Sequence, residues 1–127
     1  MKNFIALPFA ALMLVSVQAS ALCLNVSESF GGIVEQKEEI TVKGPFTITG
    51  SNGCSSANIE AMISVGGVGR VPQISIEQEV GSSWRTVAAN PLSPRASWLG
   101  PLGTYRVRVY NPDEQSKAYS GTVRYGR

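Results

Sequence analysis

Short runs in which apolar and polar residues alternate fill the chain from residue 33 onward. Ile74 and Ile76, for example, lie two positions apart with Ser75 between them. A two-residue period is typical of β-strands that bury one face and expose the other. The pattern predicts strands over residues 33–38, 39–43, 46–50, 58–64, 73–80, 84–88, 104–110 and 119–125.

Turn-forming residues separate these runs. Gly, Pro, Asn and Ser recur between them, as in Gly81-Ser82-Ser83 and Asn111-Pro112. Turn signals spaced every 8–12 residues are typical of an antiparallel sandwich or barrel, and no segment shows a helical repeat with caps. The sequence therefore predicts an all-β, antiparallel β-sandwich of about seven or eight strands.

The first 21 residues have the character of an export signal. A short positive start, Met1-Lys2-Asn3, precedes 14 largely apolar residues, 4–17, and then Gln18-Ala19-Ser20-Ala21. A membrane-spanning helix needs about 20 apolar residues, whereas signal peptides combine a short apolar region with small residues at the cleavage site. We predict a cleaved signal peptide over residues 1–21, a single domain over 22–127, and a periplasmic or extracellular location. We expect no membrane insertion of the mature chain.

Cys23 and Cys54 both lie in the predicted mature chain. An even pair of cysteines in an exported protein indicates a disulfide. The bond would close a loop of about 30 residues and contribute about 3–4 kcal/mol by restricting the unfolded chain.

The last strands carry a resemblance to a known family. Gly103-Thr104-Tyr105 leads into alternating Val107 and Val109, then an Asn-Pro turn, then Tyr119-x-Gly-x-Val. This order resembles the end of the bacterial pre-peptidase C-terminal domains, and the similarity extends over residues 45–126. It implies a jelly-roll-like sandwich. The acidic Asp-x-Asp run usual in that family's central strand is absent here, so the calcium site of some relatives is not expected.

The residue types argue against catalysis. The chain contains no histidine, which excludes the usual hydrolase triads and most zinc sites, and the disulfide would consume both thiols. Glu77 and Glu79 lie on one side of a predicted strand and are interpreted as a solvated face rather than as a glycosidase pair. We predict no enzymatic activity, no metal and no cofactor. The mature net charge of +1 gives no reason to expect nucleic-acid binding.

Arginines alternate with the buried positions of the last strands. A two-residue period places Arg106, Arg108 and Tyr110 on one face. If the last two strands form a hairpin, Arg124 joins them. Like charges across strands need compensation, which either neighbouring glutamates such as Glu77 or an anionic ligand would supply.

The two tryptophans have different surroundings. Trp84 follows the Gly-Ser-Ser turn and is expected to cap the core. Trp98 lies between Pro94 and Pro101 in a segment that reads as a loop, where it either caps the core or anchors a partner.

These observations favour a small exported binding protein of bacterial type, which recognises a protein or an anionic polysaccharide. The expected binding residues are Arg106, Arg108, Tyr110, Arg124 and Trp98. Two alternatives stay open. An inhibitor or immunity protein would block an enzyme or toxin with a loop, either residues 66–70 or 90–103. A structural subunit would assemble through an exposed edge strand.

Overall fold

The computed structural model describes residues 23–67, 69–91 and 93–127. Within these residues the chain forms eight strands: β1 Asn25–Val34, β2 Glu39–Ile48, β3 Ala57–Val65, β4 Gln73–Val80, β5 Ser83–Ala89, β6 Arg95–Gly100, β7 Gly103–Tyr110 and β8 Lys117–Gly126. The signal peptide predicted over residues 1–21 lies outside the described residues, so it stays a prediction.

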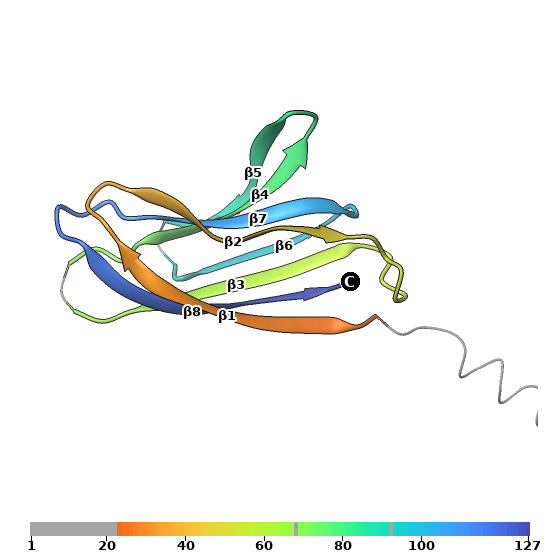
Figure 1. The fold of residues 1–127 in the computed structure, drawn as a ribbon, viewed down its shortest axis with the longest axis horizontal. Coiled ribbons are helices and arrows are strands. Elements are labelled where there is room, and N and C mark those ends of the chain that lie inside the picture. The colour runs from red at the N-terminus through yellow and green to blue at the C-terminus, as the bar shows by residue number, and fades with distance from the viewer. Residues whose placement is uncertain (1–22, 68, 92) are drawn as a thin grey trace, which may run out of the picture.

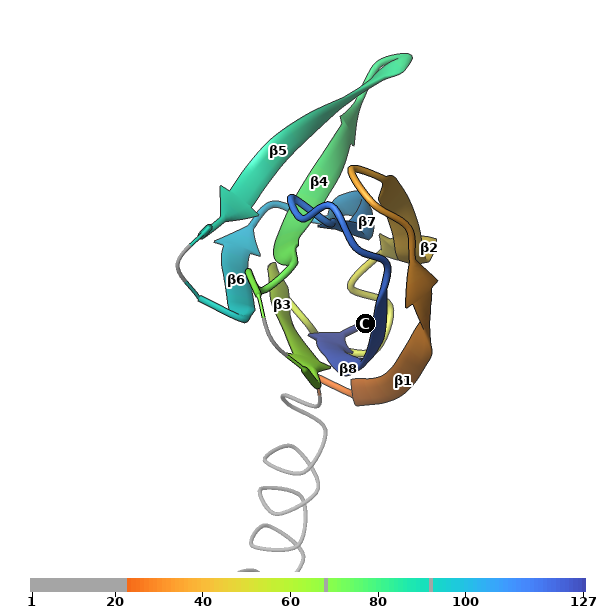
Figure 2. The same ribbon diagram turned by 90° about the vertical axis from the view of Figure 1, so that its left-hand side faces the viewer.

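The strands form two four-stranded sheets that face each other (Figures 1 and 2). The first sheet has the order β1-β8-β3-β6, and the second has the order β2-β7-β4-β5. Strand β1 pairs with β8, β2 with β7, β3 with β6 and β4 with β5, all antiparallel. The chain is thus one long hairpin, folded at the β4–β5 turn, whose successive strand pairs alternate between the sheets. This is the jelly-roll arrangement, and the predicted all-β antiparallel sandwich is confirmed.

The core lies between the two sheets. Ile59 and Val123 of the first sheet and Ile76 of the second are fully buried, as the period-two pattern requires. The ring of Phe46 from β2 stacks on that of Tyr125 from β8, with the centroids 4.3 Å apart. Interdigitation of alternate residues from both sheets supplies the apolar burial that holds such a sandwich together.

The apolar–polar alternation does not predict most of β1 or any of β6. In β1 the inward positions include a charged residue, Glu28, and Gly31-Gly32 follows, so the apolar alternation is interrupted. The six residues of β6 lie between Pro94 and Pro101, which read as loop signals. Both are edge strands, where proline and charged residues limit pairing with other chains.

Residues 33–50 also differ from the prediction. Strand β1 ends at Val34, and the backbone N–H of Glu38 donates to the carbonyl of Glu35 in a turn. The two strands predicted over 39–43 and 46–50 are one strand, β2. Its pairing register with β7 shifts on both sides of Lys43. The strand therefore continues through Gly44 and Pro45 with an irregularity, which an edge strand tolerates.

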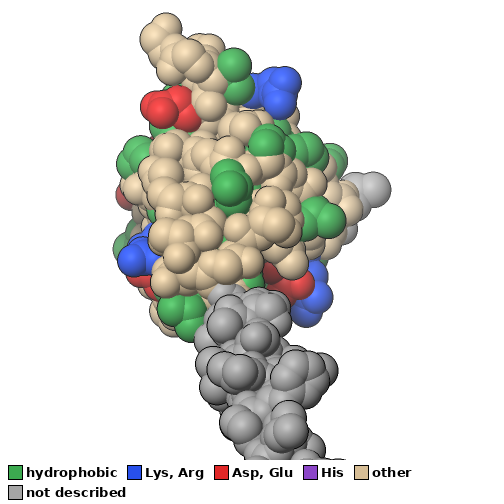
Figure 3. Space-filling view, turned by 90° about the vertical axis from the view of Figure 1, so that its right-hand side faces the viewer, with side chains coloured by type: hydrophobic (Ala, Val, Ile, Leu, Met, Phe, Trp, Pro, Cys, Tyr) green, Lys and Arg blue, Asp and Glu red, His purple; other side chains and the backbone are tan. Residues whose placement is uncertain are grey.

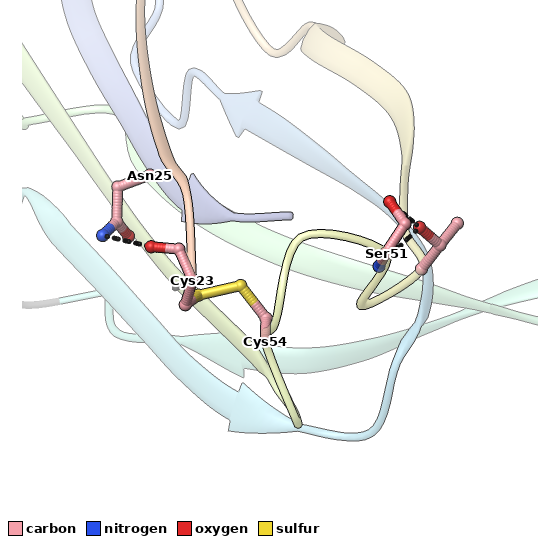
Figure 4. The surroundings of a disulfide bond; sticks show 5 residues. Cys23, Asn25, Ser51 and Cys54 are labelled. Carbon is pink, nitrogen blue, oxygen red and sulfur yellow. Dashed lines mark hydrogen bonds between the residues drawn. A yellow bond between two sulfur atoms is a disulfide. The ribbon is translucent and has the colours of Figure 1, made fainter. Parts of the chain in front are cut away.

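The predicted disulfide between Cys23 and Cys54 is confirmed, with a Cα–Cα distance of 4.4 Å (Figure 4). It joins Cys23, two residues before the start of β1, to the loop that leads into β3. The side chain of Asn25 donates a hydrogen bond to the carbonyl of Cys23, 3.5 Å away. The disulfide therefore attaches the start of the described chain to the rest of the sandwich.

Candidate functional site

Arg106, Arg108 and Tyr110 share the outer face of β7, as the sequence predicts. Their neighbours Val107 and Val109 are fully buried, so the alternate side chains point away from the core. Strand β7 lies inside the second sheet, between β2 and β4. The outer face is therefore built from side chains of adjacent strands, and their charges determine how the arginines are held.

Arg124 does not join them. Strands β7 and β8 belong to different sheets, so the hairpin that would have placed Arg124 beside Arg106 and Arg108 does not form. The link from Asn111 to Ser116 carries the chain across to the first sheet. There Arg124 lies opposite Glu60 and Ser27, with its Nη1 3.9 Å from Glu60 Oε1. The expected patch of three arginines is divided between the two outer faces.

Arg106 is tightly held. Its Nε donates to Glu77 Oε1 at 2.6 Å, and both side chains are largely buried. Its guanidinium carbon also lies 4.2 Å from the centre of the Trp84 ring. A close ion pair and a cation–π contact together satisfy this charge from within the protein. Compensation by Glu77, one of the two options that the sequence leaves open, is the one the structure shows for Arg106.

Arg108 is held more loosely. Its Nη1 lies 3.5 Å from Glu39 Oε1, and its Nη2 lies 3.4 Å from the Glu39 carbonyl oxygen. Its Nε is buried and has no hydrogen-bond partner among the described residues. Contacts of this length are weak, because charge-assisted N–H···O bonds are normally about 2.7–2.9 Å long. Arg108 is therefore only partly compensated.

Trp84, which the sequence suggests caps the core, lies outside it, and Trp98 takes the first of the two roles that the sequence leaves open for it. Trp84 lies opposite Glu79 on the outer side of the β4–β5 pair, where it contacts Arg106 and is only partly buried. Trp98 is on strand β6 rather than in a loop, and it packs against the core. Its Nε1 donates to the Tyr105 hydroxyl at 3.3 Å. Trp98 thus lies apart from the arginines, and Trp84 is the aromatic residue beside them.

We call the surface made by Trp84, Arg106, Arg108 and Tyr110 the arginine face. The β4–β5 hairpin at its border projects well beyond the two layers of the sandwich (Figures 1 and 2). At the hairpin tip, Val80 has 47% of its surface exposed. The site therefore combines a charged sheet surface with a projecting hairpin.

Asn111 fixes one end of this surface. Its buried side-chain amide donates to the carbonyls of Val34, Glu35 and Gln115, at 3.3, 3.1 and 2.7 Å. Its backbone N–H donates to the carbonyl of Glu38 at 2.9 Å. These bonds tie the β1–β2 turn to the end of β7, and so place Glu39 beside Arg108.

Two carboxylates elsewhere have lowered pKa values. Hydrogen bonds from Lys43 and then Tyr125 lower the pKa of Glu28, which lies on the edge strand β1. The backbone N–H of Glu114 and then the Lys117 ammonium lower the pKa of Asp113, in the β7–β8 link. Both are structural contacts outside the arginine face.

The loops proposed for an inhibitor are partly integrated into the fold. Arg70 donates from Nη2 to the carbonyl of Pro112 at 3.0 Å, which attaches the glycine-rich loop to the β7–β8 link. The segment 90–103 contains strand β6. Beside them lies a hollow of about 390 Å³, lined by Arg70, Val71, Gln73, Pro91, Ser93, Pro94 and Pro112.

In the part of the chain that the structure describes, no group of three or more His, Cys, Asp or Glu residues could hold a metal ion. Among the described residues there is no helix long and apolar enough to cross a membrane. At the end of the sandwich where the described chain begins, the visible hydrophobic side chains form separate spots among polar and backbone atoms (Figure 3).

Comparisons with known proteins show similarity at the level of the fold. No family model matches the chain, so the resemblance to pre-peptidase C-terminal domains has no support beyond the sandwich it implies, and no curated protein matches it either. The Yersinia pseudotuberculosis-derived mitogen superimposes with a TM-score of 0.56 and 14% identity, over 80% of this chain and 86% of the mitogen. Aeromonas hydrophila PliG, a periplasmic lysozyme inhibitor of g-type lysozyme, gives 0.42 and 14%, over 83% and 87%. At such identity the likeness to the mitogen concerns the fold.

Proposed function

We propose that this is an exported binding protein, without catalytic activity, that recognises a protein partner through the arginine face. Export is supported by the Cys23–Cys54 disulfide, because such bonds persist in oxidising compartments. The signal-like residues 1–21 support it independently. The finer choice between periplasm and medium does not affect the binding proposal.

The observation that carries the proposal is the position of Trp84. Trp84 lies near the tip of the β4–β5 hairpin, on its outer side and in contact with Arg106, and is only partly buried, so it leaves apolar surface where a partner can reach it. Tryptophan, tyrosine and arginine are the residues that most often dominate protein–protein binding energy. All three types occur together on the arginine face.

The charges on this face favour a protein over an anionic polysaccharide. Arg106 is already paired with Glu77, and Glu39 contacts Arg108. A polyanion needs a run of uncompensated cations, since each anionic group must be matched along its length. Alternating acidic and basic side chains instead suit a protein surface with complementary charges.

Capture from the envelope proteins of the producing organism tests the proposal. The oxidised protein would be immobilised beside Trp84→Ala and, as a matched control on the opposite face, Arg124→Gln. We expect a protein that the native chain and the Arg124 variant retain and that the Trp84 variant loses, with unchanged thermal unfolding of both variants. Equal retention by all three would move binding to residues 66–70 or 90–103 and favour the inhibitor alternative.

A further inference from the structure

We infer that Arg108 receives a carboxylate side chain, Asp or Glu, from the protein partner, and that Glu39 occupies this position in the unbound protein. The inference rests on the proposed function, because it identifies the chemistry that the arginine face recognises. It assigns different tasks to two arginines that are equivalent in the sequence.

The two ion pairs of the face differ in their length and in the exposure of their carboxylates. Arg106 and Glu77 are joined at 2.6 Å, with 21% and 12% of their side chains exposed. Arg108 and Glu39 approach to 3.5 Å, with 23% and 45% exposed. A short, shielded pair resists displacement, whereas a long pair with a solvated carboxylate contributes little. A partner carboxylate can therefore replace Glu39 at Arg108 but not Glu77 at Arg106.

The surroundings of Arg108 suit a carboxylate. Thr41 on β2 and Ser75 on β4 lie directly opposite Arg108 in the two neighbouring strands. Each group in this row can donate to a carboxylate: the two hydroxyls donate one O–H each, and the planar guanidinium binds a carboxylate through two parallel bonds. The unpartnered Nε shows that the present contacts leave the guanidinium incompletely satisfied.

The Glu39 side chain can move away from Arg108 without disturbing the sheet. It is the first residue of the edge strand β2 and directly follows the β1–β2 turn. Its backbone stays fixed, because Asn111 donates to the carbonyl of the preceding residue, Glu38. Only the exposed side chain has to rotate into solvent when a partner carboxylate arrives.

A single carboxylate fits better than a polyanion. Glu39, Glu77 and Glu79 belong to the same outer face as Arg108. A second or third negative charge on the ligand would lie against these glutamates, and like charges in close contact disfavour binding. The partner therefore presents one acidic side chain within an otherwise neutral or polar surface.

The direct test uses sodium acetate as the probe and follows the carbon-13 signals of the arginine guanidinium groups by NMR. These carbon signals do not depend on slow proton exchange, so the shielded Arg108 and the exposed Arg124 can both be followed. Glu39→Gln removes the resident carboxylate, and Glu60→Gln is the matched control, because it frees the exposed Arg124 in the same way. We expect a saturable shift of the Arg108 signal, with affinity about two- to fivefold higher in Glu39→Gln than in the native protein. Sodium chloride of equal ionic strength should not reproduce it.

Two results would overturn the inference. One is an acetate response of Arg124 in Glu60→Gln as large as that of Arg108 in Glu39→Gln, which would mean that any freed arginine responds. The other is the absence of saturation in both variants.

Partner capture separates this inference from the proposed function. Capture lost in Trp84→Ala but retained in a folded Arg108→Gln variant would keep the function and reject the inference. Loss in both variants, with increased capture by Glu39→Gln, supports both. Capture unchanged in Trp84→Ala would reject the proposed function, and the acetate titration would still decide whether Arg108 forms a carboxylate site.

Discussion

Lys43 on β2 and Glu28 on β1 join the two sheets at one edge of the sandwich, with Lys43 Nζ 2.6 Å from Glu28 Oε2. The hydroxyl of Tyr125 donates to the other carboxylate oxygen at 2.8 Å. Glu28 thus connects an edge strand of each sheet with the aromatic stack of the core. The charged residue that interrupts the alternation of β1 has a structural role.

Acid should weaken this connection. The pKa of Glu28 is lowered by the Lys43 and Tyr125 hydrogen bonds, and that of Asp113 by the Glu114 N–H and Lys117. A carboxylate whose folded pKa lies below its unfolded value stabilises the protein above the unfolded pKa. We expect the free energy of unfolding to be constant near neutral pH and to fall as the pH drops below about 4.5, measured by urea unfolding at several pH values.

Glu28→Gln checks the origin of this dependence. The variant should lose about 1 kcal/mol at pH 7, since an amide replaces a charge-assisted acceptor. It should also show a smaller decrease in stability below pH 4.5 than the native protein. An unchanged acid profile would mean that Glu28 contributes nothing to it.

Replacing Asn111 should lower the free energy of unfolding more than replacing Glu28. Its side-chain amide nitrogen donates hydrogen bonds to three backbone carbonyls, at 2.7–3.3 Å. Asn111→Ala would leave buried acceptors without donors, and we expect a loss of about 3 kcal/mol in urea unfolding. Asn111→Asp is the informative companion, because it keeps the shape but cannot donate. A loss below about 1 kcal/mol in both variants would contradict the role of the amide.

The two tryptophans should respond in opposite ways. Trp98 packs against the core and donates to Tyr105, so Trp98→Ala should cost about 3 kcal/mol of stability. Trp84 lies outside the core, so Trp84→Ala should cost less than about 1 kcal/mol. Thermal unfolding of both variants provides the comparison. A reversed order would place Trp84 in the core, as the sequence alone suggests.

The disulfide should stabilise the sandwich without shaping the arginine face. Replacing both Cys23 and Cys54 with serine should lower the free energy of unfolding by about 3–4 kcal/mol. The Arg108 response to acetate should persist in this variant, because Cys54 follows the end of β2, where Ile48 pairs with Gly103, whereas Arg108 pairs with Thr41 near the other end of β2. Loss of the response in a folded double variant would show that the two regions are coupled.

The sequence by itself determined the strands whose alternation is apolar throughout, such as β4 and β7, because a strand with one buried face must repeat every two residues. It also determined the cysteine pair and the outward direction of Arg106 and Arg108. Only the tertiary structure decided which strands share a sheet. The jelly-roll connection separates Arg124 from the other arginines, although β7 and β8 are neighbours in sequence. It likewise turns Trp84 outward and Trp98 inward, because a tryptophan's burial depends on the face that its strand presents to the opposite sheet, and no local pattern carries that information.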